Sequence, residues 1–154
     1  YNQGISTVMI LDNSITGMTG HQDNPCTGKT LKGEKVYGIL PDNICRAAGI
    51  APDHIRIVDP FNLEETERVI REELEAPVPS VIIARRPCAL LKYVKRGEPL
   101  VVNTAKCVGC KACMKIGCPA ISVVDKKARI DTTLCTGCNL CRQLCRPGAI
   151  GAAQ

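Results

Sequence analysis

Residues 107–119 read CVGCKACMKIGCP, and residues 135–147 read CTGCNLCRQLCRP. Each segment holds three cysteines at intervals of three residues and a fourth soon afterwards, so eight of the eleven cysteines belong to one duplicated motif. A loop with this spacing can wrap three thiolates around one corner of an iron–sulfur cube and leave one iron for a fourth cysteine. The pattern predicts two [4Fe-4S] clusters.

Zinc sites and a disulfide framework are the alternative uses of so many cysteines. A zinc site built from two Cys-x2-Cys pairs leaves the third cysteine of each triplet without a role. Disulfides are typical of exported domains, and the sequence has neither a recognisable signal peptide nor a run of 18 apolar residues. We therefore expect a reducing, cytoplasmic setting and no membrane association.

The duplicated motif resembles the bacterial two-cluster ferredoxin domain, in which three cysteines of one copy share a cluster with the last cysteine of the other. The resemblance implies one cluster on Cys107, Cys110, Cys113 and Cys145, and a second cluster on Cys135, Cys138, Cys141 and Cys118. The sequence departs from the family pattern in two places, because four residues rather than three precede Cys118 and because Arg146 separates Cys145 from Pro147. We expect these departures to shift local turns without abolishing cluster binding.

Residues 98–154 contain no Phe, Tyr or Trp, so the clusters are expected to act as the core of a small α+β ferredoxin-type domain. The formal net charge of the chain is +5. Eight thiolates and two oxidised cubane cores would lower it to roughly +1. The basic balance therefore gives no indication of nucleic-acid binding.

Residues 1–97 alternate short apolar segments with helical patterns. Strands are expected at residues 5–11, 54–58, 81–84 and 100–102, and helices at residues 41–48 and 62–75. The first strand is rich in β-branched residues and is expected to be buried. In the second helix, Asn62 and Glu65 form a capping-box signature. The apolar residues expected to share one face of that helix are Leu63, Val69, Ile70 and Leu74. The alternation predicts a parallel α/β sheet over residues 1–97, followed by a second domain over residues 98–154.

The loop after the first strand, residues 12–22, reads DNSITGMTGHQ. It leaves the carboxyl end of a strand, which is where parallel sheets bind ligands. The loop resembles the thiamine diphosphate-binding domain of 2-oxoacid:ferredoxin oxidoreductases, and within that group the α subunits of indolepyruvate ferredoxin oxidoreductases, which carry Thr-Gly-His-Gln. Asp59-Pro60 and residues 85–90 also resemble those subunits, which end in a two-cluster ferredoxin domain. The resemblance covers essentially the whole chain.

The resemblance implies that thiamine diphosphate and Mg²⁺ bind at this loop, with oxygen ligands for the metal from the Asn13 side chain and the Ile15 carbonyl. The cofactor-binding residues expected are Asp12, Asn13, Ile15, Gly17, Thr19, Gly20 and Gln22, with Thr16 as a further polar neighbour. His21 is a candidate acid–base group because imidazole titrates near neutrality, although a loop His is more often only a polar neighbour. The Gly-Asp-Gly metal motif of the family is missing from the sequence. We therefore expect half of a thiamine site and the C-terminal part of a longer protein.

The reaction that the resemblance implies is oxidative decarboxylation of an aryl-2-oxoacid with coenzyme A, which gives an aryl-acyl-CoA, CO₂ and reduced ferredoxin. A β subunit and an external ferredoxin would be the partners, and this fragment alone is expected to be inactive. Two alternatives remain open. The chain could be a two-cluster electron carrier whose α/β part only docks it to a partner, or part of a pyruvate or 2-oxoglutarate oxidoreductase.

Three cysteines lie outside the repeat, at Cys26, Cys45 and Cys88. None has a Cys-x2-Cys partner, so free thiols are expected, with Cys45 buried in the first helix. His54 is expected to have a structural role.

Overall fold

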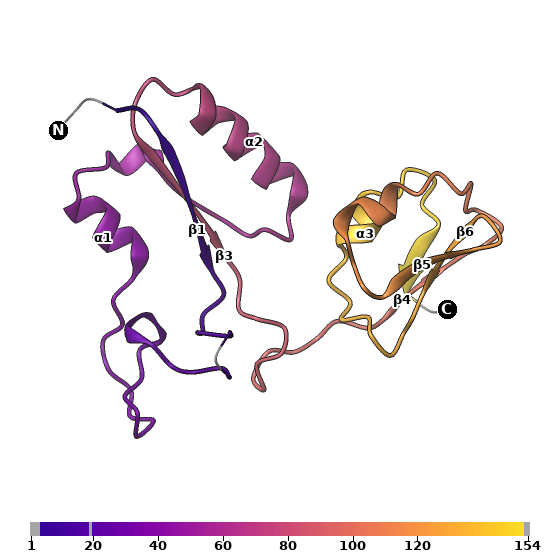
Figure 1. Ribbon diagram of the computed structural model, residues 1–154, viewed down its shortest axis with the longest axis horizontal. Coiled ribbons are helices and arrows are strands. Elements are labelled where there is room, and N and C mark those ends of the chain that lie inside the picture. The colour runs from indigo at the N-terminus through magenta and orange to yellow at the C-terminus, as the bar shows by residue number, and fades with distance from the viewer. Residues whose placement is uncertain (1–3, 19, 153–154) are drawn as a thin grey trace. The chain divides into compact units, whose positions relative to one another are not determined.

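The computed structural model describes residues 4–18 and 20–152. The chain divides into two compact units, Tyr1–Val94 (unit 1) and Lys95–Gln154 (unit 2), as Figure 1 shows. Each unit is described by itself below. Across the described residues, no helix has the length and apolar character that crossing a membrane requires.

Unit 1 is built on a parallel three-stranded sheet in the order β1-β3-β2, which confirms the predicted α/β class. Its strands are β1 (Thr7–Asp12), β2 (Ile55–Val58) and β3 (Ser80–Arg85), and its helices are α1 (Pro41–Ala47) and α2 (Leu63–Glu75), with two 3-10 turns at η1 (Pro25–Thr27) and η2 (Pro52–His54). Five of the six residues of β3 are buried, because the central strand has helix α1 over one face and α2 over the other (Figure 1).

Alternate residues of β3 serve two separate apolar clusters. Val81 and Ile83 pack with Cys45 of α1, whereas Ile82 packs with Val69 of α2. Ile83 has no exposed surface, and Ile82 is 1 % exposed. A strand whose side chains alternate between two covered faces reads as a continuous apolar run, which is why the sequence of this segment was informative.

The prediction that the first strand is buried was wrong. Strand β1 lies at the edge of the sheet and pairs only with β3 among the described strands. Its apolar side chains are largely exposed in the structure, including Val8, Met9 and Leu11. An apolar β-branched run fits an edge and a centre equally well by composition, so local sequence does not separate the two.

Helix α2 begins as predicted, since the Asn62 side chain accepts a hydrogen bond from the backbone N–H of Glu65. The prediction that Leu74 belongs to the buried apolar face was wrong. Leu74 is 67 % exposed, whereas the neighbouring Glu73 is 2 % exposed. At 100° per residue, Glu73 lies about 40° from Val69 on the buried face, whereas Leu74 lies about 140° from Val69, on the side of the helix that faces solvent. The buried Glu73 carboxylate lies 2.8 Å from His54 Nδ1 and 2.9 Å from the Arg56 guanidinium. His54 therefore has a structural role, at the amino end of β2.

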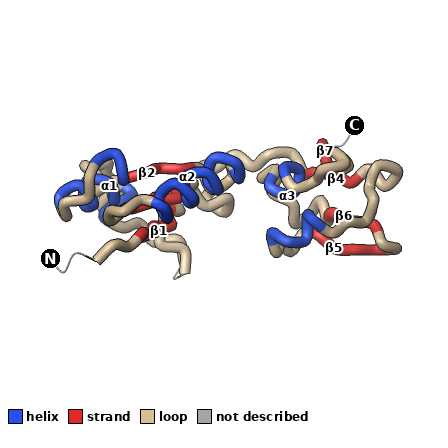
Figure 2. The backbone as a smooth tube through the Cα atoms, turned by 90° about the horizontal axis from the view of Figure 1, so that it is seen from above, coloured by secondary structure: helices blue, strands red, loops and turns tan. Residues whose placement is uncertain are grey.

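Unit 2 consists of two antiparallel strand pairs and two short helices. The elements are β4 (Leu100–Val102), η3 (Ala112–Ile116), β5 (Ile121–Val124), β6 (Lys127–Ile130), α3 (Leu140–Gln143) and β7 (Ile150–Ala152). Figure 2 shows β4 beside β7 and β5 beside β6. A strand at residues 100–102 is therefore confirmed, but it pairs with β7 of unit 2 and does not extend the parallel sheet.

The core of unit 2 is small and has no aromatic side chain among its buried members. The repeated Ala-Ile pairs, Ala120-Ile121 and Ala149-Ile150, are all at most 6 % exposed. Cys107, Cys113 and Cys141 belong to the same buried cluster. The cysteines of the motif thus form part of the core, as expected for a domain of this size.

Candidate cofactor sites

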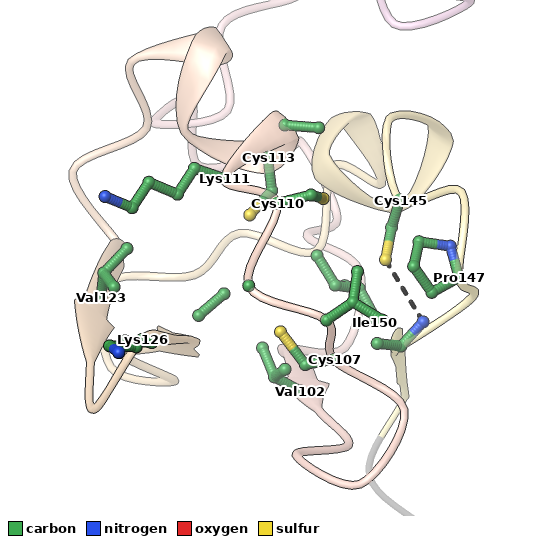
Figure 3. Close-up of a pocket in the computed structure, with 15 residues that line it drawn as sticks. Val102, Cys107, Cys110, Lys111, Cys113, Val123, Lys126, Cys145, Pro147 and Ile150 are labelled. Atoms are coloured by element: carbon green, nitrogen blue, oxygen red, sulfur yellow. Dashed lines mark hydrogen bonds between the residues drawn. The ribbon is translucent and has the colours of Figure 1, made fainter.

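The first candidate site is a cavity in unit 2 (Figure 3). Its wall includes four cysteines, Cys107, Cys110, Cys113 and Cys145. Cys107 and Cys110 come from the loop that leads into η3, Cys113 lies in η3, and Cys145 follows α3 in the second copy of the motif. This is the set that the ferredoxin resemblance implies for one cluster.

The second candidate site is a cavity whose wall includes the other four cysteines of the motif, Cys118, Cys135, Cys138 and Cys141. Cys118 belongs to the first copy and the other three to the second, so the chain exchanges one cysteine in each direction.

The donor chemistry of both cavities fits a multi-iron cluster. Among residues 4–18 and 20–152, no three His, Cys, Asp or Glu side chains converge closely enough to hold a single metal ion. The thiols are instead spread around an open space, as a cubane requires, because each thiolate binds a different iron. The four sulfurs of the first cavity can be followed in Figure 3.

Backbone amides support individual sulfurs at both cavities. The N–H of Ala149 donates to Cys145 Sγ at 3.2 Å, drawn as the dashed line in Figure 3, and the N–H of Leu100 donates to Cys135 Sγ at 3.4 Å. The N–H group of Ala128 is the largest cause that lowers the pKa of Cys107. Such hydrogen bonds stabilise negative charge on sulfur and are a means of tuning cluster potentials.

Burial acts in the opposite direction on the innermost thiol of each set. Burial is the largest cause that raises the pKa of Cys113, and the other cysteines of its cavity contribute. Burial likewise raises the pKa of Cys141 to about 11, with contributions from the other three cysteines of its own cavity. Four thiolates gathered in an apolar space repel one another, and a cationic iron core would offset that repulsion.

The third candidate site is the loop that leaves the carboxyl end of β1. Asp12, at the end of β1, accepts hydrogen bonds from the backbone N–H of Ser14 at 3.0 Å and from Arg85 Nε at 2.8 Å. Arg85 also donates to Asp42 at 2.9 Å, and this hydrogen bond is the largest cause that lowers the pKa of Asp42. Asp12 is thus tied to β3 and positions the loop.

The turn that follows lines a cavity of about 180 Å³ with Asn13, Ser14 and Ile15 among others. The Asn13 side-chain oxygen accepts the N–H of Ile15 at 3.1 Å, and the Asn13 carbonyl accepts the N–H of Cys88 at 2.9 Å. An amide oxygen has two lone pairs, so Asn13 keeps one for a cation. Side-chain and carbonyl oxygens are the donors that Mg²⁺ prefers.

The rest of the loop folds back on itself as a small hairpin. Thr16 and Gln22 exchange two backbone hydrogen bonds of 3.0 Å each. Within the turn, Gly20 has a φ of 99°, a conformation that favours glycine, and nothing lies within 4 Å of the side chain that it lacks. Gly17 approaches Asn13, His21 also has a left-handed backbone, and Thr19 lies outside the described residues.

The sequence reasoning missed Asn24 and Cys26, which line the same cavity as Asn13. The Asn24 side chain donates to Thr16 Oγ1 at 3.0 Å and caps the η1 turn. The signal was present, because Asn24, Pro25 and Thr27 have the spacing of a capping box that opens on a proline. All three cysteines outside the repeat are free thiols in the structure, and Cys45 is buried as predicted.

Comparison with known proteins matches both parts of the chain. Residues 1–84 match the family model of the thiamine pyrophosphate enzyme C-terminal TPP-binding domain, and residues 99–146 match a 4Fe-4S dicluster domain. An indolepyruvate oxidoreductase subunit IorA of Pyrococcus horikoshii is 40 % identical over 97 % of this chain, and one of Archaeoglobus fulgidus is 36 % identical over the full chain. The aligned regions make up 24 % and 25 % of those relatives, so the chain spans about a quarter of their length. The expected resemblance is confirmed, and the chain belongs to the thiamine pyrophosphate enzymes, with a C-terminal TPP-binding domain followed by a 4Fe-4S dicluster domain.

Proposed function

We propose that the protein containing this chain is a 2-oxoacid:ferredoxin oxidoreductase that decarboxylates aryl-2-oxoacids with coenzyme A. The observation that carries the proposal is the union of a TPP-binding loop and two four-cysteine cavities in one polypeptide. The relatives named indolepyruvate oxidoreductase subunit support the aryl class of substrate. A carrier that only transfers electrons has no use for the loop after β1.

At the thiamine site, Asn13 and the carbonyl of Ile15 would hold Mg²⁺ against the diphosphate. Because Gly17 and Gly20 have no side chains, the loop backbone there would leave room for the phosphate oxygens of the cofactor. Thr19 and Gln22 would be polar neighbours of the cofactor. When bound, thiamine diphosphate supplies the nucleophile and the electron sink for decarboxylation. Asp12 keeps the loop in place through Arg85.

His21 is the remaining titratable side chain of the loop. It sits next to Gln22, one of the two ends of the hairpin. We propose it as a group near the substrate that could exchange a proton.

In unit 2, the cysteines of the two cavities would each hold one [4Fe-4S] cluster, with Cys145 and Cys118 exchanged between the copies. Two clusters in series shorten each electron transfer toward an external ferredoxin. A β subunit would complete the enzyme, in keeping with the word subunit in the names of the relatives. Eight thiolates require reducing surroundings, so we propose a cytoplasmic location.

The experiment is a comparison of the full-length protein, with its partner subunit, and its Asn13→Ala variant. Calorimetric titration with thiamine diphosphate should show Mg²⁺-dependent binding that the variant weakens by about tenfold or more, since an oxygen ligand is lost. Glu64→Ala provides a control, because this exposed residue of α2 lies outside the loop and does not line its cavity. Arylpyruvate should reduce ferredoxin faster than pyruvate does.

Each failure has a distinct meaning. Faster turnover of pyruvate would refute the aryl substrate and leave the class of enzyme standing. A full-length protein that accepts electrons but binds no thiamine diphosphate would refute the enzyme and favour the electron carrier.

A further inference from the structure

The two copies of the cysteine motif carry different charges around otherwise equivalent cysteines. A shift of 28 residues superimposes Cys107, Cys110 and Cys113 on Cys135, Cys138 and Cys141. The same shift places Lys106, Lys111 and Lys115 of the first copy on Leu134, Asn139 and Gln143 of the second. Two exchanges run in the other direction and set Arg142 against Met114 and Arg146 against Cys118. The first copy therefore carries three basic residues and the second carries two.

The walls of the two cavities show the same asymmetry. Lys111 and Lys126 line the first cavity, as Figure 3 shows, whereas the described lining of the second cavity has no charged side chain. The first cavity also reaches the surface, because Cys110 is exposed and Val108 beside it is 68 % exposed. An apolar centre with a charged rim is the usual anatomy of a protein–protein interface.

The backbone of both lysines is in a conformation that lysine disfavours. Lys111 has a φ of 60° and Lys126 has a φ of 64°, both in the left-handed region. Asn139, the counterpart of Lys111, has the same conformation with a φ of 64°. Asparagine tolerates this region far better than lysine does. Lysine at position 111 thus strains the backbone locally, although the fold of the loop does not require a lysine there. Residues with strained backbones cluster at functional sites.

The fold does not use these lysines for its own ion pairs. Among the described residues, neither Lys106, Lys111 nor Lys115 forms an ion pair. Lys127, by contrast, donates to the carbonyl of Cys107 within the unit. The acidic residue nearest in sequence to the rim is Asp125, next to Lys126 in the turn between β5 and β6. The rim charges therefore remain available to a partner.

The charge of unit 2 as a whole points the same way. Residues 95–154 contain ten Lys or Arg and three Asp or Glu, a formal charge of +7. Eight thiolates and two oxidised cubane cores would leave roughly +3. A positive electron-transfer surface attracts a negative carrier and orients its approach.

We propose that Lys111 and Lys126 at the first cavity, together with Lys106 and Lys115 of the same copy of the motif, dock an acidic iron–sulfur carrier protein, and that the cluster held by Cys107, Cys110, Cys113 and Cys145 is the one from which electrons leave. The inference rests on the proposed function. In each transfer the reduced cluster loses one electron and returns to its oxidised state, and the oxidised carrier gains that electron. Nearby positive charge favours the reduced, more negative state of a cluster, so the lysines also draw electrons to the exit.

The test uses the full-length protein with its clusters loaded and a variant built from the protein's own second copy, Lys106→Leu, Lys111→Asn and Lys115→Gln. These residues are already accepted in the equivalent loop, and Lys111→Asn relieves the disfavoured backbone. Binding of a purified acidic ferredoxin is measured by calorimetry at several salt concentrations. The variant should bind about tenfold more weakly at low salt, and its affinity should depend less on salt. The control variant is Arg142→Met, which introduces the residue found at the equivalent position of the first copy, Met114. It should leave the affinity for ferredoxin unchanged.

Turnover with two acceptors separates this proposal from the proposed function. Reduction of a small neutral quinone by arylpyruvate should persist in the triple variant, whereas reduction of the acidic ferredoxin at low salt should fall by a much larger factor. Arylpyruvate that reduces neither acceptor in the wild type would refute the proposed function. An active enzyme whose triple variant binds ferredoxin as tightly as the wild type, or whose Arg142→Met variant is the weaker binder, would refute the docking surface alone.

Discussion

Paired cysteine substitutions test whether the two cavities exchange ligands between the copies of the motif. The structure places Cys107 and Cys145 in one cavity and Cys118 in the other. The double variant Cys107→Ala, Cys145→Ala disturbs one cavity and should keep one intact cluster, or about four irons per chain. The double variant Cys107→Ala, Cys118→Ala disturbs both cavities and should keep no intact cluster.

The lining of the first cavity determines how much iron the disturbed site retains. Apart from its four cysteines, the described lining consists of Val, Gly, Lys, Ala, Pro and Ile residues. It offers no carboxylate, imidazole or hydroxyl to replace a lost thiolate. With Cys107 and Cys145 both removed, two thiolates remain for a cluster that is held by four. The iron content should therefore fall from about eight to about four per chain.

Iron and acid-labile sulfide are measured after anaerobic reconstitution, and electron paramagnetic resonance of the reduced protein shows whether a cluster remains intact. The two variants lose the same number of cysteines, so each is the control for the other. If each motif filled a cluster from its own four cysteines, the ranking would reverse and the Cys107, Cys118 variant would keep the intact cluster. That reversal would refute the shared ligands.

Two predictions concern unit 1. Glu73→Ala should destabilise this unit by about 1 to 2 kcal/mol, because His54 loses its partner and Arg56 keeps only Glu72, and thermal unfolding followed by circular dichroism measures the loss; an unchanged midpoint would contradict it. Arg85 lowers the pKa of Asp42 below its ordinary value of 3.8. The stabilisation is therefore complete above about pH 3.8 and is lost as the pH falls through the lower pKa of the folded state. The urea midpoints of the wild type and Asp42→Asn should differ at pH 6 and approach each other at pH 3, and a constant difference would refute the linkage.

The sequence was most informative where one local pattern dictates the chemistry. The spacing of the eight cysteines predicted cluster ligands, and the family resemblance divided them into the two sets that line the two cavities. The capping of α2 by Asn62 was also readable, since the donor and acceptor are three residues apart. In both cases the partners of the interaction lie within one recognisable pattern.

The sequence was least informative where distant segments decide the outcome. The ion pair of Asp12 with Arg85 joins residues 73 positions apart, and no local pattern predicts it. A charged residue such as Glu73 is not expected in a core. Its burial depends on His54 and Arg56, which lie on other elements and cannot be recognised as its partners from the sequence of the helix. The edge position of β1 follows from the strand order, which the apolar character of β1 does not encode.

The exchange of Cys118 and Cys145 between the two cavities has a consequence for biosynthesis. The first cavity lacks a ligand until residue 145 has been translated, although its other three cysteines are complete at residue 113. Iron delivered to the nascent chain would therefore meet a site with three thiolates. Under the proposed ligation, neither metal centre can be completed before the second copy of the motif has been translated, so maturation factors have to act after that point.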